Sequence, residues 1–281
     1  LSEERKRILR FYGANLIEIT AKKGGFLKCI ELADEKSRKK GFFGPKQFNN
    51  SWNVLSHKKN TAPELEKTLN DNNLGDLDVF IAGMGTGGTI MGFYHYFSQK
   101  KNNFRAYPIL PDKNEDGGHR IEGIGDSFIP KIVNLQALSP VLRVNDSDAI
   151  NISRQINKLG LSVGISSGAN IFGAILKASE LPDGSNVATI LCDDNKKYLT
   201  TDLCNDVEEH CSMDIKILDY ELFSWRKKYL CYSYFTMIRE TNNSKNNINY
   251  PKEAVPLGTY VRANRHNKLG IITDGFYDGS D

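Results

Sequence analysis

The sequence has few of the features that mark specialised classes of protein. Its five cysteines are an odd number without a C-x-x-C pair, which argues against a disulfide scaffold and against a zinc site. The 37 lysines and arginines nearly balance 34 aspartates and glutamates, so a net charge of +3 gives no reason to expect nucleic acid. No apolar run reaches the ~18 residues of a membrane span. These absences predict a soluble protein of a reducing compartment, the cytoplasm.

The chain is long enough for one large or two modest domains. Hydrophobic residues make up 40% and charged residues 25% of its 281 residues, as in an ordinary globular protein. It begins at Leu1, with neither a methionine nor a signal-like segment. That start predicts a fragment of a longer protein.

One stretch, Asp78–Phe93, concentrates glycine between two apolar patterns. Val79–Ala82 is an apolar run that predicts a strand buried on both faces. A helical spacing of apolar residues begins at Ile90. Between the two lie Gly83, Gly85, Thr86, Gly87, Gly88 and Thr89. Such a loop brings backbone amides close to an anion, and the helix N-terminus adds partial positive charge, so the pattern predicts a phosphate cradle.

Two other interpretations fit the same glycines. A tight turn with close helix packing is about as common on composition alone. The spacing of Gly83, Gly85 and Gly88 also fits a dinucleotide-binding fingerprint, with Asp112 near the place of a ribose-binding acid. No Lys-Ser/Thr pair follows the last glycine, which argues against a Walker-type nucleotide loop.

The amino-acid sequence of this stretch closely resembles the phosphate loop of the cysteine synthase (O-acetylserine sulfhydrylase) family. These are pyridoxal-phosphate enzymes that share their fold with cystathionine β-synthase. Further stretches resemble the family in the family's own order. They are 2–16, 47–65, 119–130, 161–170 and 190–203. The resemblance therefore spans about Ser2 to Leu203 and makes the dinucleotide interpretation a distant second.

The resemblance implies a role for each matching residue. Gly85, Thr86, Gly87, Gly88 and Thr89 are expected to bind the phosphate of pyridoxal 5'-phosphate. Gln47 and Gly123 are expected to contact the amino-acid substrate, with Gly123 in a Gly-Ile-Gly turn at the cofactor's open face. Asp194, with Asp193 beside it, stands where the family has a serine facing the pyridine nitrogen, and a carboxylate there favours pyridinium. His57 is expected to be structural, and Cys192 a small core residue.

The residue that the chemistry needs most is missing from this pattern. In the family, the lysine that binds the cofactor aldehyde lies upstream of the segment matched by Ser2, in an S-x-K-[DN]-R setting. No such setting occurs here. The candidate lysines lie in polar or glycine-rich runs typical of surfaces; they are Lys22, Lys23, Lys39, Lys40 and Lys46. We therefore identify no catalytic residue and no metal ligand, and expect this chain alone to be inactive.

The fold expected from the resemblance is α/β, the tryptophan-synthase-β-like pyridoxal-phosphate fold (fold type II), with two lobes and a cleft between them. The N-terminal part of the small lobe is expected to be missing. We predict domains at 1–203 (the enzyme-like domain), 204–250 (an aromatic segment and an Asn-rich linker) and 251–281 (a tail without counterpart in the family). Expected helices are 1–13, 24–40, 62 onward, 144–160 and 169–181; expected strands are 15–20, 79–82, 104–110 and 186–193, with a hairpin in 257–276.

The function implied is β-replacement, in which O-acetylserine and sulfide give cysteine and acetate. Two alternatives remain open. One is replacement with homocysteine, as in cystathionine β-synthase. Glu122, immediately before the Gly-Ile-Gly turn, resembles the sequence of that branch of the family. The other is a non-catalytic binding or regulatory protein, favoured by the absent lysine and by Asp194. The expected partners are a small amino acid and sulfide, with no nucleic acid and no membrane, and a second copy to form a homodimer when the protein is full-length.

Overall fold

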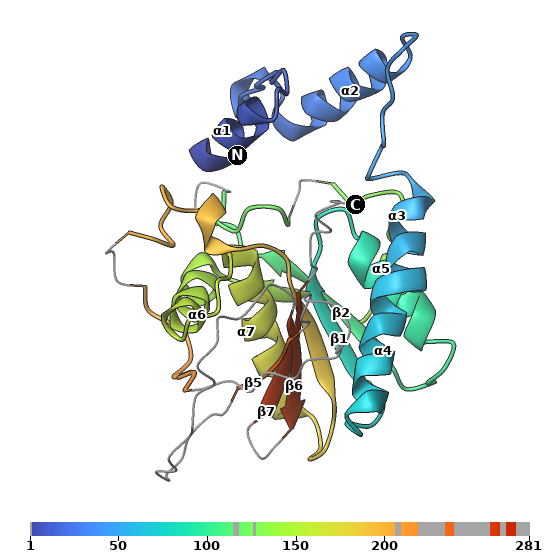
Figure 1. The fold of residues 1–281 in the computed structure, drawn as a ribbon, viewed down its shortest axis with the longest axis vertical. Coiled ribbons are helices and arrows are strands. Elements are labelled where there is room, and N and C mark those ends of the chain that lie inside the picture. Colours follow the sequence, from blue (N-terminus) through green and yellow to red (C-terminus); the bar gives the residue numbers. More distant parts are fainter. Residues whose placement is uncertain are drawn as a thin grey trace.

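The structure, a computed structural model, describes residues 2–114, 118–125, 128–205, 209–218, 234–238, 259–264 and 268–273. It has a small lobe joined by one connection to a large lobe (Figure 1). The small lobe holds α1 (Glu3–Phe11), the 3₁₀ turn η1 (Ala21–Lys23) and α2 (Gly25–Ser37). The helices of the large lobe are α3 (Ser51–Ser56), the π-helical turn η2 (His57–Thr61), α4 (Ala62–Asp71), α5 (Gly88–Phe97), η3 (Leu135–Ala137), α6 (Asp146–Lys158), α7 (Ile165–Glu180) and η4 (Asn195–Lys197).

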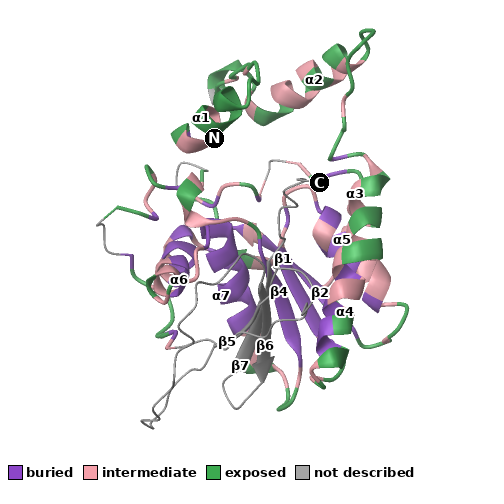
Figure 2. Ribbon diagram, in the orientation of Figure 1, coloured by how far each residue is buried: buried purple, intermediate pink, exposed green. Residues whose placement is uncertain are grey.

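A twisted sheet forms the centre of the large lobe. Its strands are β1 (Val79–Gly83), β2 (Arg105–Pro111), β3 (Leu142–Val144), β4 (Val187–Leu191), β5 (Tyr234–Ile238), β6 (Thr259–Asn264) and β7 (Lys268–Thr273). The first four are mutually parallel in the order β3-β2-β1-β4, and the others join beyond β4. Because parallel neighbours need crossover helices, both faces of this sheet are covered, as Figure 2 shows.

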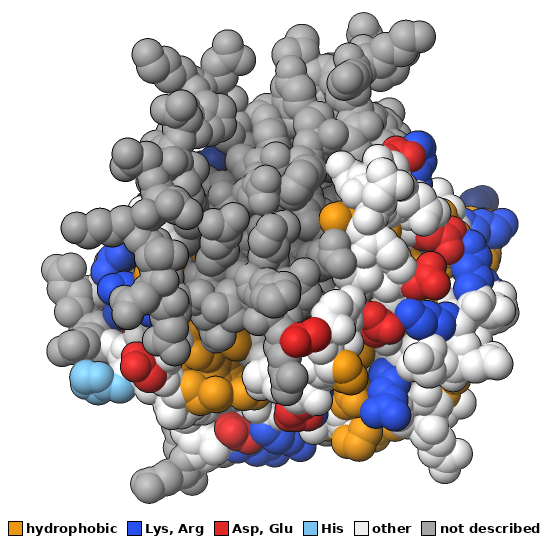
Figure 3. Space-filling model, turned by 90° about the horizontal axis from the view of Figure 1, so that it is seen from below, with side chains coloured by type: hydrophobic (Ala, Val, Ile, Leu, Met, Phe, Trp, Pro, Cys, Tyr) orange, Lys and Arg blue, Asp and Glu red, His pale blue; other side chains and the backbone are white. Residues whose placement is uncertain are grey.

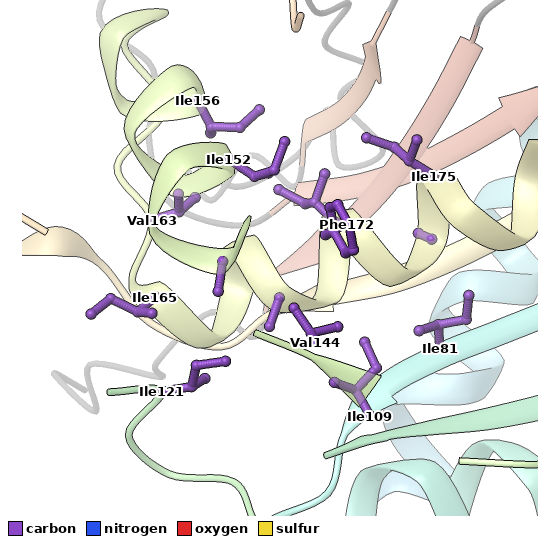
Figure 4. Close-up of a cluster of buried hydrophobic side chains, with 14 of the residues drawn as sticks. Ile81, Ile109, Ile121, Val144, Ile152, Ile156, Val163, Ile165, Phe172 and Ile175 are labelled. Carbon is purple, nitrogen blue, oxygen red and sulfur yellow. The ribbon is translucent and has the colours of Figure 1, made fainter. Parts of the chain in front are cut away.

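The alternation of side chains along β1 divides the core into two clusters. Val79 and Ile81 point into a cluster with α6 and α7, which Figure 4 shows in close-up. Phe80 and Ala82 point into the opposite cluster with α4 and α5. There Phe80 stacks on Phe93 of α5, with ring centroids 3.7 Å apart. The expected double burial of this strand is confirmed, and it fixes where the glycine loop leaves the sheet.

The small lobe has no such core. Neither α1 nor α2 contains a buried residue, although α1 carries apolar residues at helical spacing. Phe11, Tyr12 and Phe43 are 85%, 76% and 88% exposed. The upper lobe in Figure 2 is accordingly coloured exposed or intermediate throughout its helices.

Several sequence expectations need correction. The strand expected at 15–20 is absent, because no neighbouring strand is present among the described residues to receive its hydrogen bonds. Helix begins at Ser51, capped by Asn50, and runs through the π-helical turn into α4, 11 residues before the expected start at Ala62. Helix α7 begins at Ile165 rather than Ala169, because the backbone after Gly164 is already helical.

The tail is partly described. The hairpin expected in 257–276 is confirmed, with β6 and β7 antiparallel, whereas its turn at 265–267 lies outside the described residues. Most of the aromatic segment and all of the Asn-rich linker also lie outside them. The division at 203 and 250 stays a prediction.

Candidate functional site

The glycine loop between β1 and α5 presents free backbone donors. Gly87 takes the left-handed conformation, with φ +81°, and caps the start of α5. The amides of Gly85, Thr86, Gly87 and Thr89 donate no hydrogen bond to another described residue. The amide of Gly88 reaches only the Thr86 hydroxyl, at 3.3 Å. Unpaired amides at a helix N-terminus are the donors from which anion-binding nests are built.

The glycines in this loop are required by close contacts. A Cβ on Gly85 would lie 2.2 Å from the carbonyl oxygen of Gly123, and one on Gly88 would lie 2.0 Å from the Asn53 side chain. Gly125 donates to the carbonyl oxygen of Met84 at 3.2 Å. The structure therefore brings the Gly-Ile-Gly turn directly onto the glycine loop.

The two threonines of the loop are oriented by a polar network. Asn53 Nδ2 donates to Thr86 Oγ1 at 2.9 Å and to the carbonyl oxygen of Gln47 at 3.0 Å. His57 contacts Thr89 Oγ1 through Nε2 at 3.2 Å and Thr61 Oγ1 through Nδ1 at 3.0 Å. These contacts agree with a structural histidine. The side chain of Gln47 itself is exposed, so its role as a substrate contact stays a prediction.

At the carboxyl end of β4, the two aspartates lie in different environments. Asp194 caps η4 by accepting from the Lys196 amide at 3.1 Å, and its side chain is 19% exposed. Asp193 accepts from Arg5 and from the Tyr198 hydroxyl, each at 2.9 Å, while its buried Oδ1 has no partner among the described residues. Burial raises the pKa of the Asp193 carboxyl, although the hydrogen bond from Tyr198 and the charge of Arg5 act in the opposite direction.

Asn170, a fully buried residue of α7, was not predicted from the sequence. Its Oδ1 accepts from the Gly83 amide at 2.7 Å, and its Nδ2 donates to the Ile190 carbonyl at 2.7 Å. Asn170 therefore ties the end of β1, where the glycine loop starts, to the end of β4. An amide in an otherwise apolar and small-residue helix was the available signal.

Cys192, expected in the core, is exposed. Cys192 directly follows β4, at the point where the chain leaves the sheet and is no longer covered from both sides. The five lysines considered above are exposed, as expected; they are Lys22, Lys23, Lys39, Lys40 and Lys46. The described part of the chain contains no cluster of His, Cys, Asp and Glu suited to a metal ion. Among the described helices, none has the length and apolar character needed to cross a bilayer.

Comparison with known proteins gives the family. Cysteine synthase B of Campylobacter jejuni is 38% identical over 210 residues, which are 72% of this chain and 68% of that protein. A hydrogen sulfide-producing enzyme from Fusobacterium nucleatum is 39% identical with a TM-score of 0.69, covering 75% of this chain and 65% of that one. An O-acetylserine dependent cystathionine beta-synthase from Helicobacter pylori is 31% identical with a TM-score of 0.62, covering 72% and 67%.

The chain thus spans about two thirds of the length of these relatives. The fold they share with it is the α/β pyridoxal-phosphate fold expected from the sequence. The region of family likeness includes the glycine loop, the Gly-Ile-Gly turn and the strand that ends at the aspartates. Residues 1–193 match the family described as "Pyridoxal-phosphate dependent enzyme", and the chain belongs to that family.

Proposed function

We propose that this chain forms the larger part of a cysteine synthase-like enzyme that converts O-acetylserine and sulfide to cysteine and acetate. The observation that carries the proposal is the nest of free amides at Gly85–Thr89, packed against the Gly123 turn. Both lie at the carboxyl edge of the parallel sheet, where ligands bind in open α/β folds. The related cysteine synthase supports the same reaction.

The residues present fit pyridoxal 5'-phosphate. The free amides of the loop and the start of α5 would hold its phosphate, because these donors have no acceptor within the described protein. A Cβ at Gly85 would collide with the Gly123 carbonyl oxygen, so the glycine allows the turn at Gly123 to lie against the loop. The carboxylates after β4, with Asp194 at the family's serine position, would face the ring nitrogen. When bound, the cofactor supplies an electron sink for the substrate's α-carbon.

Other residues are proposed to bind the substrate and to move its α-proton. Thr86 accepts hydrogen bonds from Asn53 and Gly88, so its hydroxyl hydrogen is free to donate to a ligand anion. Gln47, exposed beside Asn53, is proposed to contact the substrate carboxylate. Moving the α-proton requires a base, and we assign that role to a lysine supplied from the part of the relatives' length that this chain does not cover. Without it we expect binding but no turnover.

The binding step is testable with the chain as it stands. Equilibrium dialysis against pyridoxal 5'-phosphate should detect saturable binding, and Gly85→Ala should weaken it at least 10-fold because the new methyl group meets the Gly123 carbonyl. Gly41→Ala is the matched control, since a Cβ there meets nothing and only its φ of +87° is unfavourable. Equal binding by parent and Gly85→Ala would refute the cradle.

The reaction is tested by adding the third of the Campylobacter protein that the chain does not cover. The mixture should develop the yellow colour of a lysine-bound cofactor and form cysteine from O-acetylserine and sulfide. The absence of both, with the added segment shown to be folded onto the chain, would favour a non-catalytic binding or regulatory protein.

A second candidate is cystathionine β-synthase-type replacement. It is favoured by Glu122, immediately before the Gly-Ile-Gly turn, and by the related Helicobacter enzyme. The same mixture discriminates the two functions when homocysteine replaces sulfide. Cystathionine formed faster than cysteine at equal thiol concentration would select the second candidate.

A further inference from the structure

The two helices of the small lobe contact the large lobe differently. Phe26 of α2 packs on Phe128, with ring centroids 6.1 Å apart, whereas the first turn of α1 makes polar contacts. Ser2 Oγ donates to the carbonyl oxygen of Lys197 at 2.6 Å. Glu4 accepts from the amide and the hydroxyl of Thr200, each at 3.1 Å. Because α1 buries no apolar side chain, its position over the sheet edge depends on such directional contacts.

Arg5 makes the most extensive of these contacts. Its Nη1 donates to Glu122 Oε2, and its Nη2 donates to Asp193 Oδ2 at 2.9 Å and to the Tyr198 hydroxyl at 2.8 Å. The guanidinium carbon lies 4.6 Å from the centre of the Tyr198 ring. One side chain of the small lobe therefore joins the Gly-Ile-Gly turn to the segment that follows β4. These four residues are called the Arg5 latch.

The chemistry of the latch requires an arginine. Two different guanidinium nitrogens reach the two carboxylates, and the flat face lies on an aromatic ring, an arrangement that a lysine ammonium does not reproduce. The side chains of Arg5, Asp193 and Glu122 are 20%, 13% and 33% exposed. In such partly desolvated surroundings a carboxylate left without its cation is costly, so separation of the lobes is opposed at this point.

We propose that Arg5 is a positioning residue, which fixes the small lobe over the carboxyl edge of the sheet and holds Glu122 and Asp193 at the ring end of the cofactor site. The part that concerns the cofactor rests on the proposed function. Arg5 acts through Glu122 and Asp193. It couples two motifs that lie 71 positions apart in sequence, at Glu122 and Asp193, to the placement of a separate lobe.

Hydrogen exchange measures the latch without any cofactor. Arg5→Ala should raise exchange of the α1 amides at least 10-fold, whereas Arg7→Ala, an exposed arginine of the same helix, should leave it within twofold. Arg5→Lys should recover only part of the protection, because it keeps the charge and loses the fork. Exchange unchanged in Arg5→Ala, or fully restored by Arg5→Lys, would overturn the proposal.

A double-substitution cycle tests the partner. If Arg5 acts through Glu122, Arg5→Ala combined with Glu122→Gln should exchange no faster than Arg5→Ala alone. If the exchange rate of the double variant rises by the product of the two single effects, Arg5 and Glu122 act independently and the shared contact is contradicted. Circular dichroism of each variant shows whether the large lobe is folded, so that a general loss of structure is separated from release of α1.

The cofactor arm uses two probes. Arg5→Ala should weaken pyridoxal 5'-phosphate binding at least fivefold and change the absorption spectrum of the bound cofactor. Competition by inorganic phosphate, which probes the glycine loop alone, should be unaffected. Weakening of both probes alike would overturn the placement of the latch at the ring end. If the parent chain binds no cofactor, the proposed function fails while the exchange experiment still decides the latch.

Discussion

The two lobes differ in how completely they bury their own apolar residues. Helix α7 of the large lobe has 11 buried residues among its 16, and every residue of β4 is buried. In the small lobe, α1 and α2 have none. The large lobe therefore contains the hydrophobic core, whereas the apolar side chains of the small lobe stay mostly exposed, and Phe26 of α2 is covered in part by Phe48 and Phe128.

This difference shows that the regular structure of the chain depends on tertiary partners as well as on local sequence. A helix is stabilised mainly by packing its apolar face, and a strand needs neighbours for its backbone groups. The large lobe provides both for β1, since β2 and β4 flank it and helices cover its faces. Residues 14–20 have strand-like composition without such neighbours and adopt no regular structure. The described part of the surface shown in Figure 3 carries both acidic and basic side chains, in keeping with the small net charge of the chain.

The largest effect is expected from a truncation in the large-lobe core. Phe93→Ala removes a fully buried ring stacked on Phe80, and should lower the free energy of unfolding by about 3–5 kcal/mol. Phe43→Ala, at a ring that is 88% exposed, is the control and should change it by less than about 0.5 kcal/mol. Urea denaturation followed by circular dichroism measures both. Similar losses from the two variants would erase the distinction between the lobes.

A second comparison uses one thiol from each lobe. Burial raises the pKa of Cys211 in the large lobe from 9.0 to about 11, which reduces its reactive thiolate about 100-fold at pH 8. Alkylation with iodoacetamide, read by peptide mass spectrometry, should therefore be much slower at Cys211 than at Cys29 of α2, which lies in a helix without buried residues. Because the neutral thiol is favoured, the rate at Cys211 should still be rising at pH 10. A rate that levels off near pH 9 would contradict the burial.

The link between β1 and β4 is tested at Asn170. Asn170→Ala leaves the Gly83 amide and the Ile190 carbonyl without their buried partner, and should cost about 1–3 kcal/mol of unfolding free energy. It should also weaken pyridoxal 5'-phosphate binding, because Gly83 begins the glycine loop. Asn157→Ala, a half-buried asparagine on the neighbouring helix, serves as the comparison for binding. Normal binding by Asn170→Ala would show that the loop holds its shape without this contact.

The smallest effect is expected on the small lobe. Phe11→Ser with Tyr12→Ser removes two rings that are 85% and 76% exposed, so unfolding free energy should change by less than about 0.5 kcal/mol. Sedimentation should give the same mass for parent and variant. A loss above 1 kcal/mol, or a shift from dimer to monomer, would show that these rings are covered in solution and that the lobes differ less than the structure indicates.

Local sequence pattern predicted the large lobe well and the small lobe less well. The run at Val79–Ala82 and the glycines after it predicted strand, loop and helix, because each signal is local and the tertiary packing agrees with it. The strand expected at 15–20 failed because pairing depends on partners that a local pattern does not reveal. Helix from Ser51 was missed because the 47–61 stretch lacks apolar periodicity, and Asn50 is the cap that signals its start.

The same limit applies to the site. The resemblance to the family's sequence motifs identified the glycine loop and the Gly123 turn, and the structure brings the two into contact. The roles of Asp193, Asp194 and Gln47 remain predictions. Asn170 and Arg5 were not singled out, since their partners lie 20 to 193 positions away in sequence and their importance comes from what the fold brings together.

The pairing of the C-terminal hairpin with the sheet has a consequence for colloidal behaviour. Strand β7 runs along β4, with Ala188 opposite Gly270 through Leu191 opposite Thr273. A strand as apolar as Val187–Leu191 with bare amides and carbonyls along one side is a template on which foreign chains can assemble into aggregates. By pairing with that side, the hairpin prevents intermolecular pairing at β4, and variants of the protein that end before Thr259 are expected to aggregate and to give little soluble protein.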